Sequence, residues 1–323
     1  MNKLMTVVAA SVCAVSLSGS AIAAEDQSTE NEKDSNAEAA EALEEEESKV
    51  FEAGFDFEFF SAYVWRNAVQ TDEPVIQPCV WADLTYFEPF WLGFSIWQNY
   101  DLTSRRHEFL KGGLTETDYN VHLGATAWSN DDETMSLDLE IGHDWYVNQQ
   151  VKSDAKEDYK NTAELYLKAT FNNEIANVYA QASWMYDDFG SYKQGMHYEL
   201  GFNKEIELCD SLTLGADWNL NFGDSRYLYF LYGGTPSGVY YDEEAEEFTD
   251  DYAANPKAGI GGTTLKAYLS WAITDWMSLV GTVAYTGVLN GSARQALADD
   301  AGWQGDQYRR DLLWGGVSLK FEF

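Results

Sequence analysis

The chain has 323 residues, a formal net charge of −34 and an aromatic content of 15%. So large an excess of acid excludes nucleic-acid binding, which needs a basic face. Beyond residue 23 the sequence holds no apolar run of the roughly 20 residues that a membrane-crossing helix needs.

The first residues have the composition of an export signal. A short positive start precedes an apolar stretch from Leu4 to Leu17, and small residues follow at 20–24. This order is typical of a secretory signal. We therefore predict a signal peptide at residues 1–23.

The next segment, residues 24–49, is rich in Glu and Ala and lacks aromatic residues. Such a segment buries too little apolar surface to fold alone. We predict an acidic disordered periplasmic tail here. The alternative is an acidic plug or a partner-binding arm at the mouth of a pore.

From Val50 onward, apolar and polar residues alternate with a period of two, which places them on opposite faces of strands. Most alternating segments have roughly 10 to 13 residues, the length of a tilted strand that crosses a bilayer. The predicted strands are 51–64, 75–86, 90–98, 117–128, 135–147, 162–171, 176–187, 196–207, 211–222, 263–273, 277–286 and 312–323.

The connections between these strands alternate in length, long and then short, along the whole chain. Outer-membrane barrels show this asymmetry, with an even strand number in bacterial single-chain examples. We therefore predict an all-β fold over residues 50–323, a transmembrane antiparallel up-and-down β-barrel of about 12 strands. Its short turns are expected in the periplasm and its long loops outside, in the outer membrane of a Gram-negative-type bacterium. A soluble secreted β-protein is the alternative.

The longest connection, 223–262, is acidic and rich in Gly. For its stretch from Tyr227 to Tyr232 we predict a hairpin arm that extends the barrel outward. Aromatic residues gather at the strand ends, where they are expected to form girdles at headgroup level: Tyr63, Trp65, Tyr86, Phe90, Trp145, Phe171, Tyr186, Phe222, Trp276 and Tyr285.

The polar faces of the strands are mostly acidic. The predicted pore-lining residues are Asp56, Glu58, Asp83, Asp138, Glu140, Glu164, Lys168, Glu199, Asp217 and Lys266. Because an unpaired buried ion costs several kcal/mol, so many carboxylates favour a water-filled interior. Large inward rings are expected to narrow the bore: Trp81, Trp97, Tyr166, Tyr179 and Tyr268.

A wet lumen lined with carboxylates favours cations over anions. We therefore predict a porin-like channel for passive diffusion of small polar solutes, with a preference for cations. The alternative is a non-conducting structural or adhesive surface barrel.

The remaining reactive residues predict no enzyme, no cofactor and no metal site. The histidines lack metal-ligand spacing. Cys79 and Cys209 fall on non-neighbouring strands, so we predict no disulfide between them. An outer-membrane lipid hydrolase needs a Ser and a His on the lipid face. His143 has lipid-facing parity, but no serine stands two residues away on that face.

Two stretches resemble known outer-membrane proteins. Tyr63-Val64-Trp65-Arg66, followed by Gln70-Thr71-Asp72 and Pro74-Val75-Ile76-Gln77, resembles the opening of the TorF-type putative porins, although Asn67 replaces their usual Gly. The final strand ends on Phe323, which resembles the closing strand of bacterial outer-membrane barrels. These resemblances imply a porin-like barrel with a poorly defined solute, and barrel-assembly machinery that reads Phe323.

Arg66 and Asp72 flank the turn within that first stretch. We predict that they lie at the outer rim and pair across the turn. An exposed pair contributes about 0–1 kcal/mol, so Arg66 is expected to anchor a loop and not to form a site.

Overall fold

A computed structural model describes residues 51–87, 89–103, 113–132, 134–148, 161–186, 195–232, 240–242, 247–249, 257–294, 297 and 310–323. The chain divides into two units, residues 1–48 and 49–323, and every described residue belongs to the second. The predicted signal peptide (1–23) and acidic tail (24–49) lie outside the described residues. Among those described, no helix has the length and apolar character needed to cross a membrane.

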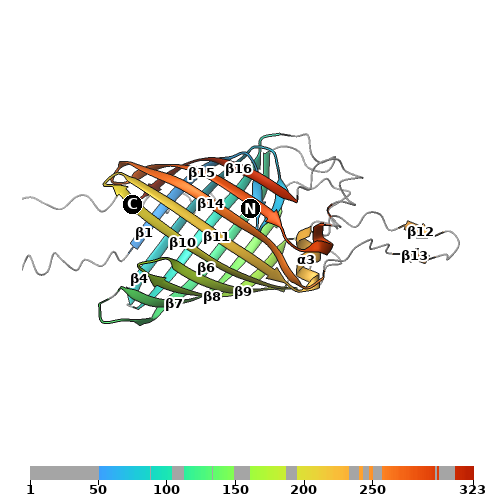
Figure 1. Cartoon of the computed structure of the whole chain (residues 1–323), viewed down its shortest axis with the longest axis horizontal. Coiled ribbons are helices and arrows are strands. Elements are labelled where there is room, and N and C mark those ends of the chain that lie inside the picture. The colour runs from blue at the N-terminus through green and yellow to red at the C-terminus, as the bar shows by residue number, and fades with distance from the viewer. Residues whose placement is uncertain are drawn as a thin grey trace, which may run out of the picture. The chain divides into compact units, whose positions relative to one another are not determined.

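Twelve strands form a closed antiparallel barrel (Figure 1), in the order β1-β16-β15-β14-β11-β10-β9-β8-β7-β6-β5-β4. The first strand pairs with the last from Gly54↔Glu322 to Phe60↔Gly316, which confirms the predicted closure. The strands are β1 (Phe51–Phe60), β4 (Val75–Phe87), β5 (Phe90–Asp101), β6 (Gly113–Ser129), β7 (Met135–Asn148), β8 (Thr162–Asn173), β9 (Asn177–Met185), β10 (Gly195–Cys209), β11 (Leu212–Gly223), β14 (Gly259–Thr274), β15 (Met277–Val288) and β16 (Asp311–Glu322).

The connections sort by length as the sequence predicts. The short ones all join strands at the end of the barrel that carries the C-terminus, which we call the short-turn end (Figure 1). The opposite end, called the long-loop end, carries α3 (Ser225–Tyr232), β12 (Tyr240–Asp242) and β13 (Glu247–Thr249). This is the loop asymmetry of outer-membrane barrels.

The outer wall of the barrel is an apolar belt. Alternate residues of neighbouring strands expose large hydrophobic side chains there, as predicted from parity. Because lipid chains cannot solvate backbone polar groups, a closed sheet with such a wall suits a bilayer. The exposed set includes Phe57, Phe59, Val80, Leu84, Leu92, Phe94, Val121, Leu123, Leu139, Ile141, Leu165, Leu167, Leu200, Phe202, Leu214, Leu265, Leu269 and Val283.

The predicted aromatic girdles are correct in part. Rings at several strand ends are exposed on the outer wall: Phe90, Trp145, Phe171, Trp276 and Tyr285. Tyr63 is instead buried, at 8% exposure, and Trp65 packs edge-on against Tyr146, 5.3 Å between ring centres. Both were assigned to the outer wall because β1 was expected to continue to residue 64, whereas it ends at Phe60.

On the inner wall, six glycines each lie directly across from a ring on the neighbouring strand. The pairs are Gly54↔Trp81, Gly93↔His122, Gly124↔Trp91, Gly142↔Tyr166, Gly201↔Tyr179 and Gly215↔Tyr268. A Cβ added at any of these glycines would lie between 2.0 and 2.5 Å from the nearest ring atom. The rings therefore lie flat over the glycines, so Trp81, Tyr166, Tyr179 and Tyr268 narrow the bore less than predicted.

The predicted hairpin arm at Tyr227–Tyr232 is wrong, because this stretch forms helix α3. Asp224 caps the helix: the backbone N–H of Tyr227 donates to its Oδ1 at 2.8 Å. The backbone N–H of Met196 donates to its Oδ2 at 3.0 Å, which ties the cap to β10. Leu228 and Tyr232 are then buried at 0% and 1% exposure.

We expect Gly142→Ala to destabilise the barrel by about 1–3 kcal/mol, because the new methyl group would displace the Tyr166 ring. Gly281 also lies within a barrel strand, β15, but a Cβ added there would have no atom within 4 Å. Gly281→Ala is therefore the matched control and should not destabilise. Urea unfolding in detergent micelles, followed by tryptophan fluorescence, measures both variants. Equal effects would contradict the packing role of the glycines.

Candidate functional site

A hairpin folds into the barrel between β1 and β4. It consists of β2 (Tyr63–Trp65) and β3 (Ala68–Thr71). Its two turn residues, Arg66 and Asn67, have positive φ angles of 48° and 65°. Tight two-residue turns of this hand favour Asn and Gly, and a left-handed conformation costs most other residues about 1–2 kcal/mol. Arg66 is therefore an unusual residue at this turn, and its side-chain contacts must offset the conformational cost.

The hairpin reaches across the lumen to the opposite wall. In the closed ring of strands, β9 lies six strands from β1 in either direction. Arg66 bonds Glu164 on β8 and His197 on β10, the two strands that flank β9. The hairpin therefore crosses the bore at the long-loop end.

Arg66 forms a bidentate ion pair with Glu164. Its Nη2 donates to Oε2 at 2.5 Å and its Nη1 to Oε1 at 3.2 Å. Nη1 also donates to the Tyr227 hydroxyl at 2.6 Å and lies 2.9 Å from Nδ1 of His197, while Nη2 donates to the Tyr146 hydroxyl at 3.3 Å. The guanidinium lies 5.0 Å from the centre of the Trp65 ring, in reach of a cation–π contact.

Burial and charge act against each other at this site. The side chains of Arg66 and Glu164 are 10% and 0% exposed. Burial opposes the charge of Arg66, but the Glu164 carboxylate, together with Tyr227, Tyr146 and Asp144, outweighs this effect and holds the pKa of Arg66 well above its usual value. Burial raises the pKa of Tyr227 well above normal, so this phenol remains a neutral hydrogen-bond partner.

Further contacts lock the tip of the hairpin against β11 and β14. The side chain of Asn221 donates to the backbone oxygen of Arg66 and accepts from the backbone N–H of Gly262. Asn67 donates to the Gly262 carbonyl at 3.1 Å. Behind the tip, Ala68 joins a buried apolar cluster with residues of α3, the end of β15 and the segment that follows β15: Leu228, Tyr232, Val288, Ala293 and Leu297.

The predicted Arg66–Asp72 pair at the outer rim is therefore wrong. Arg66 points inward and forms its ion pair with Glu164, 98 positions away in the chain. One sequence signal was available: two short apolar runs flank the pair Arg66-Asn67, a pattern that favours a tight hairpin with an apolar environment. Nothing local in the sequence identifies the partners on β7, β8 and β10.

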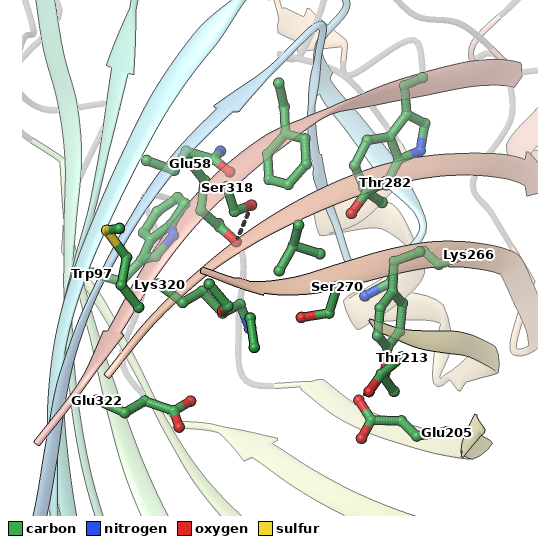
Figure 2. A pocket seen from close by; sticks show the side chains of 18 of the residues that line it. Glu58, Trp97, Glu205, Thr213, Lys266, Ser270, Thr282, Ser318, Lys320 and Glu322 are labelled. Carbon is green, nitrogen blue, oxygen red and sulfur yellow. Dashed lines mark hydrogen bonds between the residues drawn. The ribbon is translucent and has the colours of Figure 1, made fainter. Parts of the chain in front are cut away.

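Between the hairpin and the short-turn end, the lumen holds a cavity of about 750 Å³. Figure 2 shows side chains from several strands pointing into it, with Glu58 and Ser318 on one wall and Lys266 and Glu205 on another. At the hairpin its lining is aromatic: Phe60, Tyr63, Trp65, Trp97 and Trp314. Towards the short turns its lining includes polar and charged residues such as Thr274, Asp275 and Glu322.

The predicted pore-lining residues do not all meet in this cavity. Glu58 and Lys266 line it, and Lys266 pairs with Asp217 at 3.0 Å. Asp56 lies in register between Lys320 and Cys79 on the neighbouring strands. Glu164 lies in the hairpin network instead.

Three other predicted carboxylates accept hydrogen bonds from neutral donors along the wall. Glu140 and Glu199 accept from the hydroxyls of Tyr166 and Tyr179, at 2.8 and 2.7 Å. Asp138 accepts from Thr126 and Asn172, at 2.8 and 2.6 Å. Phenol and amide donors thus bond to carboxylates that have no lysine partner among the described residues. The sequence analysis instead expected water to solvate these carboxylates.

Three further residues that the sequence analysis named, Asp83, Lys168 and His143, also have nearby partners. Asp83 lies 3.5 Å from Nε2 of His122. Lys168 lies 5.6 Å from the centre of the Tyr179 ring. On the outer wall, His143 lies with Nε2 2.5 Å from the Tyr186 hydroxyl oxygen.

Reactive groups elsewhere in the described residues are dispersed. The thiols of Cys79 and Cys209 are both free. Across the described strands, turns and helices, no three His, Cys, Asp or Glu side chains are grouped to hold a metal ion.

Comparison with known proteins identifies one family. The family model described as MltA-interacting protein MipA matches residues 90–297. No curated protein matches the chain by sequence. The comparisons do not show the TorF-type family that the first hairpin resembles, and that resemblance stays a prediction.

Several solved structures are similar in fold. An outer membrane channel from Pseudomonas putida F1 is 9% identical, with 84% of this chain and 94% of that chain covered and a TM-score of 0.45. The NanC porin is 9% identical, with 83% and 98% covered and a TM-score of 0.45. Outer membrane phospholipase A from Escherichia coli is 12% identical, with 84% and 92% covered and a TM-score of 0.42. Likenesses this distant carry no conclusion about activity or solute.

We expect Arg66→Ala to lower the free energy of unfolding by about 3–5 kcal/mol, because it leaves the Glu164 carboxylate buried without its partner. The control is Lys266→Ala, whose ion pair with Asp217 is 35% and 25% exposed and should be worth about 0–1 kcal/mol. Denaturant unfolding in micelles measures both.

The double variant Arg66→Ala with Glu164→Ala should recover part of the loss, since no uncompensated charge remains. A loss for Arg66→Ala no larger than for Lys266→Ala would contradict a central role for the buried pair.

Proposed function

This chain belongs to the MltA-interacting protein MipA family, and we propose that it is a porin-like channel for passive diffusion of small polar solutes, gated by the hairpin at residues 61–74. The closed barrel with its apolar belt lies in the outer membrane. By the loop asymmetry of such barrels, the short-turn end faces the periplasm.

One observation carries the proposal: a polar cavity occupies the lumen from the short-turn end up to the hairpin. The only cation at the hairpin tip that the described residues 61–74 contribute is Arg66, and its ion pair with Glu164 holds the hairpin across the bore. Movement of this one hairpin would join the cavity to the long-loop end. Such loop motions are common in gating.

A preference for cations is part of the proposal. Inward carboxylates outnumber inward lysines among the described strands, and rings of Asp and Glu raise the local concentration of cations. Neutral donors along the wall stabilise these carboxylates without adding positive charge, as Tyr166 does for Glu140.

A second candidate is a non-conducting barrel that binds a periplasmic protein at its short-turn end. Two observations favour it. The hairpin, α3, Ala293 and Leu297 pack together at the long-loop end, and the family description names an interaction with another protein, MltA. An adhesive surface barrel remains a further alternative.

The processing of the chain completes the proposal. Residues 1–23 would direct export and residues 24–49 would remain as an acidic tail. Barrel-assembly machinery would read Phe323, whose side chain is 71% exposed at the short-turn end.

We expect the wild-type barrel to give rare current steps in planar bilayers, because the hairpin blocks the bore. Replacing residues 62–71 with a flexible Gly-Ser linker should give frequent and larger steps. Asp131→Asn, in an exposed turn outside the lumen cavity, should behave like the wild type. Absence of discrete steps from the linker variant, in protein shown to be folded, would favour the non-conducting candidate.

We expect cation preference to fall when inward carboxylates become amides. The test variant combines Asp56→Asn, Glu58→Gln, Asp138→Asn and Glu140→Gln in the linker background. The control removes the same number of charges from exposed turns, with Asp131→Asn, Asp132→Asn, Glu174→Gln and Asp210→Asn. The reversal potential in a salt gradient should move toward zero in the test variant much more than in the control. An anion-selective parent channel would refute the preference.

A further inference from the structure

The aromatic end of the lumen cavity has the features of a ligand site. We infer that it binds a small organic ammonium ion that carries an apolar body. This inference deepens the proposed function, since it names a class of solute, and rests on it for the role of the site in permeation. Binding itself needs only the cavity, whose lining extends to Thr274 and Asp275 at the short-turn end.

The charges that line the cavity favour a cation. Five acidic side chains and two lysines line it: Glu58, Asp118, Glu205, Asp275 and Glu322 against Lys266 and Lys320. Lys266 is further compensated by Asp217, which does not line the cavity. An anionic ligand would therefore meet a repulsive field, whereas a cation would be attracted.

The rings at the closed end suit a cation with an apolar body. Tyr63 and Trp97 pack with ring centres 5.3 Å apart, and Phe60 and Trp314 with centres 5.5 Å apart. Trp65 beside them already receives the guanidinium of Arg66 on its ring. Aromatic faces next to carboxylates are the usual means of recognising ammonium groups.

One acceptor at this end is unused. Asp118 lies directly across from Trp97 in the register of β5 and β6, and it lines the cavity. Its Oδ1 is buried and has no hydrogen-bond partner among the described residues. A buried polar atom without a partner is costly, so a ligand with a positive charge or an N–H donor would stabilise this site.

The cavity lining favours an organic cation over a coordinated metal ion. In the described part of the barrel, no three His, Cys, Asp or Glu side chains are grouped to hold a metal ion. The rings instead offer area that an apolar body would cover.

The test is isothermal titration calorimetry on the full chain folded in detergent. The probes are choline and its neutral carbon isostere, 3,3-dimethylbutan-1-ol. Choline should bind saturably, and the isostere at least about tenfold more weakly, as expected for loss of a cation–π and carboxylate contact. Equal binding of the two probes, or no saturable binding of choline, would overturn the inference.

Variants localise the site. Asp118→Asn and Trp97→Leu should each weaken choline binding about fivefold or more, and Trp97→Tyr, which keeps a ring, should weaken it less. The matched controls are Asp131→Asn, an exposed turn, and Trp145→Leu, on the outer wall. They should bind choline like the wild type. An equal loss in test and control variants would contradict the assigned site.

The outcome separates this inference from the channel proposal. Choline binding by a barrel that passes no current in any variant would support the site and refute the channel. Current steps from a barrel that does not bind choline would do the reverse.

Discussion

Closure of the sheet is the constraint on which the rest of this protein depends. Pairing of β1 with β16 satisfies the backbone of both terminal strands, which in lipid would otherwise expose unpaired polar groups. Closure also divides every strand into a lipid face and a lumen face. The apolar belt and the polar inner face are both consequences of that division.

The interior shows how a narrow barrel accommodates many carboxylates. Its glycines let cross-strand rings lie against the wall, and the phenols of these rings reach the acids nearby. Tyr166 covers Gly142 and donates to Glu140, and Tyr179 covers Gly201 and donates to Glu199. The same pairs therefore stabilise the sheet, satisfy the carboxylates and keep space in the lumen.

The hairpin changes what this lumen can do. A buried ion pair is a weak source of stability, because desolvation offsets most of the attraction, but it fixes one arrangement, since either charge alone is costly. Arg66 and Glu164 hold the hairpin in this way against the wall opposite β1. The same hairpin is the gate in the proposed function and the end wall of the proposed ammonium site, so both proposals depend on this ion pair.

The barrel, its strands and the sorting of its connections could be predicted from the sequence, because a period of two between unlike media is a local signal. The sequence also predicted lumen-facing acids such as Glu140 and Asp217 by parity. Tertiary structure alone decided that residues 61–74 turn inward, that α3 forms where an arm was expected, and that Arg66 meets Glu164. These outcomes depend on contacts between residues far apart in the chain, and local periodicity carries no information about which distant side chains meet inside a closed sheet.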